Sequence, residues 1–228
     1  MAPVVTFDAG QTLVDLDLDF LAHRLAERGV DASPALLTAA APAAWRRYDE
    51  LNAAGIGHPW KQLMATLLAG AHVRDAEPLA QWLWDEQPRV NLWRKPIAEV
   101  VELAKELAAR GVRVGVLSNS EGGLRRLFDE IDLSREFHAI IDSGIVGIDK
   151  PDPRIFAYTL EQLGGRADEA VHVGDSWTAD IVGALGAGWR GAIYYPSRAH
   201  QPPGEVPARV AVAHDADEMR RALSAFGI

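Results

Sequence analysis

The 228-residue sequence predicts an α/β fold in which helices cover a mainly parallel sheet and an all-helical domain follows the first strand. Two observations support this prediction. Short apolar runs alternate with amphipathic helical stretches over most of the chain, which is typical of a sheet covered by helices. The block from about residue 17 to residue 93 instead contains several helical patterns and no convincing strand. We therefore expect an α/β core domain formed by residues 1–16 and 94–228, and a helical lid domain formed by residues 17–93.

The expected strands are short apolar runs that end near polar or turn-forming residues. They are Val4–Asp8, Val112–Ser118, Ala139–Asp142, Ala170–Asp175, Gly191–Tyr195 and Arg209–Val212. Between the strands, apolar residues from Ile97 to Ala108 recur at helical spacing, with Pro96 before this helix and Gly111 after it. A closing helix should span about residues 216–226. The first strand should lie in the centre of the sheet.

The helical block has its own pattern. Apolar residues between Leu18 and Ala26 share one helical face. Ser33 and Pro34 begin a second helix, which Pro42 should interrupt or kink. Five of the seven tryptophans fall in or beside the block, and most of them should belong to the core of a small helical bundle; they are Trp45, Trp60, Trp82, Trp84 and Trp93.

Composition excludes several classes of function. The sequence is 48% hydrophobic and 24% charged, as in ordinary globular proteins, and its net charge of −9 argues against a nucleic-acid partner. It has no cysteine, which excludes disulfides, thiolate metal sites and cysteine nucleophiles. No stretch approaches the roughly 18 apolar residues of a membrane span. The first strand leaves no room for a signal peptide, so we expect a cytoplasmic protein without a membrane partner.

Polar residues follow several of the expected strands, where open α/β sheets bind their ligands. Asp8 ends the first strand, and Ser118 and Asn119 end the second, where a hydroxyl and backbone N–H groups can hold phosphate oxygens. Asp175 and Asp180 flank a turn, and paired carboxylates of this kind suit Mg²⁺. Taken singly, each residue has an ordinary alternative as a helix cap or a turn residue.

A lone lysine, Lys150, precedes the start of a helix in a chain with only four lysines. In sequence order, the polar segments resemble the four motifs of the haloacid dehalogenase superfamily. The matching positions are Asp8 to Thr12, Ser118-Asn119, Lys150, and Gly174-Asp175-Ser176 with Asp180. The resemblance covers nearly the whole chain, and the helical block resembles the α-helical C1 cap of that superfamily. It implies a Rossmann-like three-layer core, a mobile cap and hydrolysis through a covalent intermediate on an aspartate.

The resemblance also implies roles for individual residues. Asp8 would be the nucleophile and a Mg²⁺ ligand, and Lys150 would bridge the nucleophile and a phosphate group. Asp175, Asp180 and the backbone carbonyl of Gly10 would complete the metal site. Ser118 and the Asn119 amide would hold the oxygens of the transferring group, with Thr12 supporting the loop at the substrate site.

Gly10 departs from the pattern of the superfamily's phosphatases, most of which carry a second aspartate at this position. Glycine cannot transfer a proton, nor can Gln11, and losing such help typically costs about 10²–10⁴ in rate. Three routes remain: a substrate with a good leaving group, a proton from the cap (His58 or Asp49), or a proton from the substrate itself.

Gly10 also leaves other reactions open. A 2-haloacid dehalogenase releases halide without protonation, but it needs no metal, and the charges of Asp175 and Asp180 would disfavour a carboxylate substrate. A phosphonate-cleaving relative would need a cap lysine, for which Lys61 is the candidate. A phosphate- and magnesium-binding module with little turnover is a further alternative. We expect a Mg²⁺-dependent phosphatase for a small phosphorylated metabolite, as a monomer or homodimer.

Other residues have structural interpretations. His172 lies inside an expected strand and should be a core residue with satisfied hydrogen bonds rather than a base. Asp15, Asp17 and Asp19 should form a solvated junction rather than a cation site. The pair Arg46-Arg47 should lie on a solvated helix face rather than bind a substrate anion.

Overall fold

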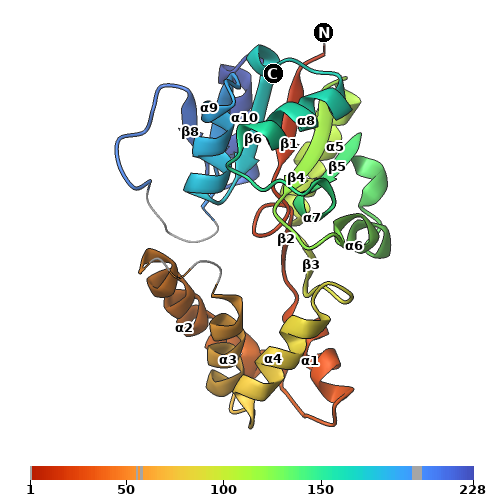
Figure 1. Ribbon diagram of the computed structural model, residues 1–228, viewed down its shortest axis with the longest axis vertical. Helices are drawn as coiled ribbons and strands as arrows, with labels where there is room; N and C mark the ends of the chain where they lie inside the picture. Colours follow the sequence, from red (N-terminus) through yellow and green to blue (C-terminus); the bar gives the residue numbers. More distant parts are fainter. Residues whose placement is uncertain (1, 55, 57–58, 197–201) are drawn as a thin grey trace. The chain divides into compact units, whose positions relative to one another are not determined.

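The computed structural model describes residues 2–54, 56, 59–196 and 202–228. These residues form two compact units, one made of Met1–Leu16 with Trp93–Ile228 and the other of Asp17–Leu92 (Figure 1). We call them the sheet unit and the helical unit.

The sheet unit contains a six-stranded sheet in which all neighbouring strands are parallel. Its order is β5-β4-β1-β6-β7-β8. The strands are β1 (Val4–Phe7), β4 (Arg113–Ser118), β5 (Ala139–Asp142), β6 (Ala170–Gly174), β7 (Gly191–Tyr194) and β8 (Val210–Val212). All six expected strands are present, and β1 lies inside the sheet, between β4 and β6. The loops after these three parallel strands therefore meet at one edge of the sheet.

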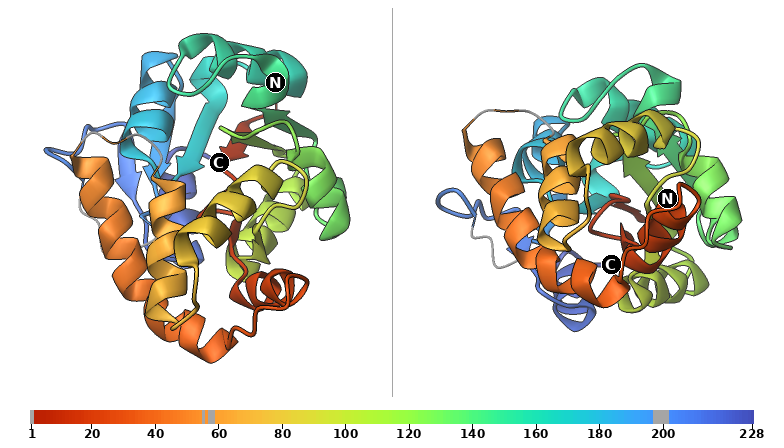
Figure 2. Two further views of the ribbon diagram at one scale, coloured as in Figure 1. Left: turned by 60° about the horizontal axis from the view of Figure 1, so that its bottom comes forward. Right: turned by 90° about the horizontal axis from the view of Figure 1, so that it is seen from below.

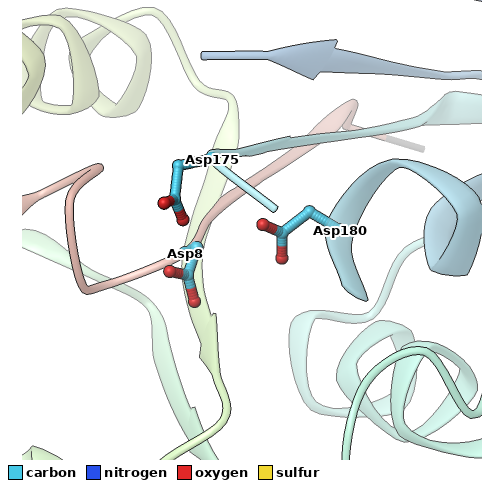
Figure 3. A group of neighbouring side chains, drawn as sticks. All are labelled: Asp8, Asp175 and Asp180. Carbon is cyan, nitrogen blue, oxygen red and sulfur yellow. The ribbon is translucent and has the colours of Figure 1, made fainter. Parts of the chain in front are cut away.

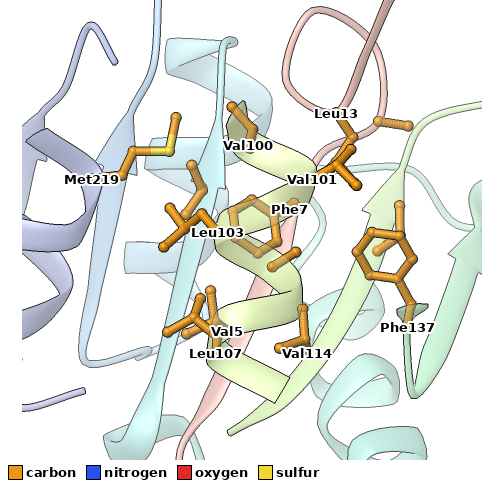
Figure 4. Close-up of a cluster of buried hydrophobic side chains, with 14 of the residues drawn as sticks. Val5, Phe7, Leu13, Val100, Val101, Leu103, Leu107, Val114, Phe137 and Met219 are labelled. Carbon is orange, nitrogen blue, oxygen red and sulfur yellow. The ribbon is translucent and has the colours of Figure 1, made fainter. Parts of the chain in front are cut away.

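Helices cover both faces of this sheet, which confirms the three-layer, Rossmann-like α/β core. One face packs against α5 (Ala98–Ala109), α6 (Leu124–Glu130) and α10 (Ala216–Ala225). Figure 4 shows this core, where Phe7 of β1 meets Leu103 of α5. The other face packs against α8 (Pro153–Leu163) and a helical segment made of η3 (Trp177–Val182), which is a π-helix, and α9 (Gly183–Gly186).

Alternation along β1 explains why the whole strand is apolar or hydrogen-bonded. Val5 and Phe7 point into the core beneath α5, whereas Val4 belongs to the core beneath α8. All four residues of β1 are buried, as expected for a parallel strand covered on both faces. The strand that leads to Asp8 is consequently packed on both faces.

A short antiparallel ribbon in the sheet unit was not expected from the sequence. It pairs β2 (Val14–Leu16) with β3 (Trp93–Pro96), and Asp15 lies opposite Lys95. These strands are three and four residues long and carry charged residues, so they lack the apolar run that indicates a strand. The remaining short elements are α7 (Ser143–Val146) and the 3₁₀ turns η1 (Ser134–Glu136) and η2 (Ala167–Glu169).

The helical unit contains α1 (Leu18–Ala26), α2 (Pro34–Ala53), α3 (Trp60–Gly70) and α4 (Ala76–Glu86). Helix α2 packs against α1 and α3, and α3 packs against α4 (Figure 2). The prediction that Pro42 interrupts the second helix is wrong, because α2 continues through it. A proline inside a helix costs about 3 kcal/mol, and the buried Leu37, Ala44 and Leu51 on the same helix offset that cost.

The tryptophans of this region are less buried than expected. Trp60 is buried and packs against Trp84 with ring centroids 5.5 Å apart. The other four are partly exposed: Trp45, Trp82, Trp84 and Trp93. The guanidinium groups of Arg24 and Arg28 both lie 5.1 Å from the ring centroid of Trp82. Cations therefore cover part of an apolar surface that the sequence alone would assign to the core.

None of the helices within the described residues is both long and apolar enough to cross a bilayer.

The contribution of the core beneath α8 can be measured with a matched pair of substitutions. Ile155 of α8 is completely buried, whereas Ile145 of α7 is 74% exposed. We expect Ile155→Ala to lower the free energy of unfolding by about 2–5 kcal/mol, because it removes buried methylenes and leaves a cavity. Ile145→Ala should change it by less than about 0.5 kcal/mol. Urea denaturation followed by circular dichroism would measure both, and equal effects would contradict the packing described here.

Candidate active site

Three carboxylates meet at the edge of the sheet where β1 and β6 end. Asp8 follows β1, Asp175 follows β6, and Asp180 lies in η3 (Figure 3). One oxygen of each carboxylate lies within 4.8 Å of the others. The backbone N–H of Asp8 continues the sheet by donating to the carbonyl of Val173 at 2.8 Å. The pairing of β1 with β6 thus fixes the position of Asp8, the candidate nucleophile, relative to Asp175, a candidate metal ligand.

Lys150 joins two of these carboxylates. Its Nζ donates to Asp8 Oδ1 at 2.7 Å, to Asp180 Oδ1 at 2.6 Å and to the carbonyl of Leu117 at 2.8 Å. The ammonium is thereby satisfied at all three of its donor positions. Lys150 and Asp180 are both buried, so their charges are little screened by solvent.

Burial and neighbouring charges shift the pKa values of these groups in different directions. Burial raises the pKa of Asp8 above its ordinary value, although the ammonium of Lys150 opposes this rise. Burial would also raise the pKa of Asp180, but Lys150 and His172 outweigh it and hold that pKa well below its usual range. Burial alone would lower the pKa of Lys150, and the carboxylates of Asp180 and Asp8 instead raise it. Lys150 is therefore a fixed positive charge.

The donor set of this site fits Mg²⁺. Three carboxylates face one ammonium, so negative charge is in excess, and every candidate ligand is a hard oxygen. Asp180 Oδ1 already accepts from Lys150 and His172, and Asp180 Oδ2 accepts from the backbone N–H of Ser176 at 2.8 Å. Both oxygens of Asp180 are thus already engaged with protein donors.

Two glycines have different surroundings at this site. A Cβ built on Gly174 would lie 2.3 Å from the carboxylate of Asp180, so this position must lack a side chain. A Cβ built on Gly10 would meet nothing within 4 Å, and the backbone there is not in the left-handed region. The structure therefore leaves room for a side chain where the phosphatase pattern has its second aspartate.

The side chain of Asn119 positions Lys150. Its Nδ2 donates to the carbonyl of Lys150 at 3.0 Å, and its Oδ1 accepts from the backbone N–H of Lys150 at 2.8 Å. These two bonds tie the loop after β4 to the segment that carries the ammonium. With both ends of the carboxamide engaged, contact between Asn119 and a substrate remains a prediction for its backbone N–H.

Ser118 and Thr12 lie in the neighbouring segments. Ser118 is the last residue of β4 and is buried. Thr12 is completely buried, and its Oγ1 has no hydrogen-bond partner among the described residues. That burial fits a supporting role in the loop better than direct contact between Thr12 and a substrate.

Asp142, which the sequence analysis missed, organises the loop after Ser118. Its Oδ1 accepts from the N–H groups of Gly122 and Gly144, both at 3.0 Å, and its Oδ2 accepts from that of Leu124 at 2.9 Å. Asp142 is itself buried. A signal was present, because Asp142 ends an apolar strand just as Asp8 does.

His172 is a core residue with satisfied hydrogen bonds, as predicted. It is completely buried, and burial lowers its pKa below the ordinary value. Its Nδ1 lies 2.8 Å from Thr6 Oγ1, and its Nε2 lies 3.1 Å from Asp180 Oδ1. The sequence did not indicate the contact with Asp180.

The cap residues singled out earlier belong to the helical unit. His58 lies outside the described residues, and Asp49 lies in α2. Lys61 donates to Gln81 Oε1 at 3.2 Å on an exposed surface. A role for any of them in proton transfer or in Schiff-base chemistry stays a prediction.

The charged residues of α2 and of the junction have local partners. Arg47 pairs with Glu50 on an exposed helix face, at 3.1 Å, as expected for a solvated pair. Asp17 Oδ1 accepts from the backbone N–H of Phe20 at 2.8 Å and caps α1, which is a structural role. Asp15 Oδ1 accepts from the N–H of Leu16 at 2.7 Å.

Comparisons with known proteins identify the family of the chain. The family model described as "haloacid dehalogenase-like hydrolase" matches residues 3–188. The "Haloacid dehalogenase-like hydrolase domain-containing protein 3" of Mus musculus is 31% identical over 133 residues, covering 57% of this chain and 52% of that protein. The phosphoserine phosphatase of Thermus thermophilus is 33% identical over 155 residues, covering 65% of this chain and 61% of that enzyme. The chain thus matches about half to three fifths of the length of these relatives.

A solved structure shares the fold along nearly the whole chain. The HAD-hydrolase YfnB of Bacillus subtilis, in a crystal form bound to magnesium, covers 97% of this chain and 98% of its own, with a TM-score of 0.67 and 19% identity. At that identity the likeness concerns the fold alone.

Loss of one carboxylate oxygen should reveal the structural role of Asp142. Asp142→Asn should lower the free energy of unfolding by about 1–3 kcal/mol, because an NH₂ group would face a backbone N–H that now donates to the carboxylate. The exposed Asp149 provides the matched control, and Asp149→Asn should have little effect. Denaturant unfolding would measure both variants, and an Asp142→Asn protein as stable as the wild type would contradict this assignment.

Proposed function

The chain belongs to the haloacid dehalogenase-like hydrolase family, and from that premise we propose that it is a Mg²⁺-dependent phosphatase acting on a small phosphorylated metabolite. The observation that carries the proposal is the convergence of Asp8, Lys150, Asp175 and Asp180 at the edge of the sheet. Attack on a phosphate anion needs a nucleophile and positive charge that offsets the repulsion. Here a carboxylate lies beside a fixed ammonium and beside oxygen ligands that suit a metal ion.

The proposed reaction has two steps. In the first, the Asp8 oxygen that is not bonded to Lys150 attacks phosphorus, a P–O bond forms, and the P–O bond to the leaving group breaks with its electrons staying on the leaving oxygen. In the second, water attacks the phosphorus of the aspartyl phosphate, which releases inorganic phosphate and restores the carboxylate. The proton lost by that water goes to phosphate or solvent.

Lys150 contributes charge to both steps. Its ammonium is held 2.7 Å from Asp8 Oδ1, where it favours the ionised nucleophile and attracts the anionic substrate. Asp8, Asp175, the carbonyl of Gly10 and, less directly, Asp180 would hold Mg²⁺, which when bound supplies Lewis-acid stabilisation of charge on the phosphate oxygens. Ser118 and the backbone N–H of Asn119 would hold the transferring oxygens.

The charge balance favours a phosphatase over a dehalogenase. A dehalogenase needs no metal ion, so the negative charge of these carboxylates would stay uncompensated. That charge would repel the carboxylate of a haloacid substrate. In a phosphatase the same carboxylates would bind Mg²⁺, which offsets their charge. The phosphatase name of the Thermus thermophilus relative supports the same proposal.

Gly10 points to the kind of phosphate ester. Because no side chain at position 10 can protonate the leaving group, substrates whose leaving oxygens are weak bases, such as aryl or acyl phosphates, should react fastest. Discrimination among substrates is proposed to reside in the helical unit acting as a cap, because the sheet unit would recognise only the transferring group.

Loss of the nucleophile and loss of the metal should have the same consequence. Phosphate release from aryl and acyl phosphates should fall by at least about 10³-fold in Asp8→Asn and in wild type with a chelator, because each removes an essential part of the proposed chemistry. Asp149→Asn should retain the wild-type rate, since Asp149 is exposed. A colorimetric phosphate assay measures all of these samples. Metal-independent halide release from a 2-haloacid, with no phosphate release from any ester, would overturn the proposal.

A side chain at position 10 should change the preference for leaving groups. We expect Gly10→Asp to raise kcat/KM for alkyl phosphates by roughly 10-fold or more, since a placed acid typically contributes about 10²–10⁴. Gly10→Asn has nearly the same shape but cannot donate an ionisable proton, so it should give no such gain. The measurement is kcat/KM across esters of graded leaving-group pKa. Equal slopes for Gly10→Asp and Gly10→Asn would show that position 10 is not where the acid acts.

A further inference from the structure

Two buried polar residues behind the site form a hydrogen-bonded chain that leads to Asp180. Thr6 of β1 and His172 of β6 are partners in the parallel register and are both completely buried. Thr6 Oγ1 lies 2.8 Å from His172 Nδ1, and His172 Nε2 lies 3.1 Å from Asp180 Oδ1. Because both side chains are completely buried and His172 contacts Asp180, we expect any effect on catalysis to act through Asp180.

The partners of His172 determine which ring nitrogen carries the proton. The Asp180 carboxylate can only accept hydrogen bonds, so Nε2 must be the protonated nitrogen. The ring packs edge-on against Phe156 and Trp189, with centroids 5.7 and 6.2 Å away, and these apolar neighbours disfavour a second proton. Nδ1 is then an acceptor, and the Thr6 hydroxyl is its donor.

This arrangement fixes the carboxylate on which Lys150 depends. Asp180 Oδ1 receives hydrogen bonds from His172 and Lys150, while Ser176 N–H holds Oδ2. The same ammonium then reaches Asp8. If the imidazole carried its proton on Nδ1, a lone pair of Nε2 would face the carboxylate and push it from its place.

We propose that Thr6 and His172 are positioning residues: the Thr6 hydroxyl donates to Nδ1 and holds the His172 ring in place, and the Nε2–H of this ring orients Asp180 toward Lys150 and the magnesium site. The inference deepens the proposed function and rests on it for the role of the metal. Partners that orient a metal ligand in this way typically contribute about 10–100-fold to metal affinity or activity.

The first test compares two substitutions of His172 in the full chain. His172→Leu removes the donor to Asp180, and His172→Gln keeps an N–H donor that can reach it. We expect His172→Leu to weaken Mg²⁺ binding, measured by calorimetry, by about 10–100-fold. The same substitution should lower kcat by a similar factor and change KM less. His172→Gln should recover most of both losses. A merely structural role would show no preference for the variant that retains the N–H.

The second test addresses the tautomer and does not depend on His172→Leu folding. Two-bond ¹⁵N–¹H NMR correlations of His172 in the wild type should show a protonated Nε2 and an unprotonated Nδ1. Thr6→Val, which removes the hydroxyl at similar volume, should leave the His172 ring less firmly held and weaken Mg²⁺ binding about 3–10-fold. The control is Thr159→Val, because Thr159 is equally buried but donates within its own helix to the carbonyl of Ile155.

The possible outcomes separate this inference from the proposed function. A wild type with Nδ1–H, or a folded His172→Leu protein with unchanged Mg²⁺ affinity, would overturn the positioning role. If Thr6→Val and Thr159→Val behave alike, the role of Thr6 is overturned. Failure of the wild type to bind Mg²⁺ would refute the proposed function, and the NMR pattern would still decide the tautomer.

Discussion

The ion pair network centred on the buried ammonium of Lys150 is the interaction on which the rest of the site depends. One nitrogen holds the carboxylates of Asp8 and Asp180 and the carbonyl of Leu117, which belong to three different segments of the chain. Such a network stabilises a protein only while every charge has its partner, and a buried carboxylate left alone is strongly destabilising. The surrounding structure is accordingly built to keep Lys150 in place, through Asn119 on one side and Asp180 with its own donors on the other.

The parallel sheet explains why these groups can be brought together at all. Strands β4, β1 and β6 lie side by side and end at one edge, so residues that are more than 100 positions apart in sequence become neighbours. Two apolar cores pack against the two faces of the sheet, while the loops beyond its edge carry the polar groups. Asp142 and Asp8 illustrate this, because Asp142 is the last residue of β5, Asp8 directly follows β1, and each engages a neighbouring segment.

The sequence was informative where burial and polarity alternate sharply. Asp8, Ser118 and Asp175 could be identified because each interrupts an apolar run at the end of a strand, and the six strands followed from the same runs. The bonds made by Asn119 and His172 could not be foreseen, because a sequence records which groups exist and not which partner satisfies them. The β2–β3 ribbon could not be predicted from the sequence for another reason. Its strands are too short and too polar to carry a periodic signal, and they are held by pairing with each other.

The two glycines of the site differ in what a mutation would meet. At Gly174 even one methyl group would collide with the Asp180 carboxylate, so the position is closed by packing to every other amino acid. Gly10 stands in open space, and the fold itself would accept a larger residue there. Selection for folding should therefore remove substitutions at position 174. At position 10 only the reaction can act as the filter, so the residue found there among descendants of this chain would record which chemistry had been selected.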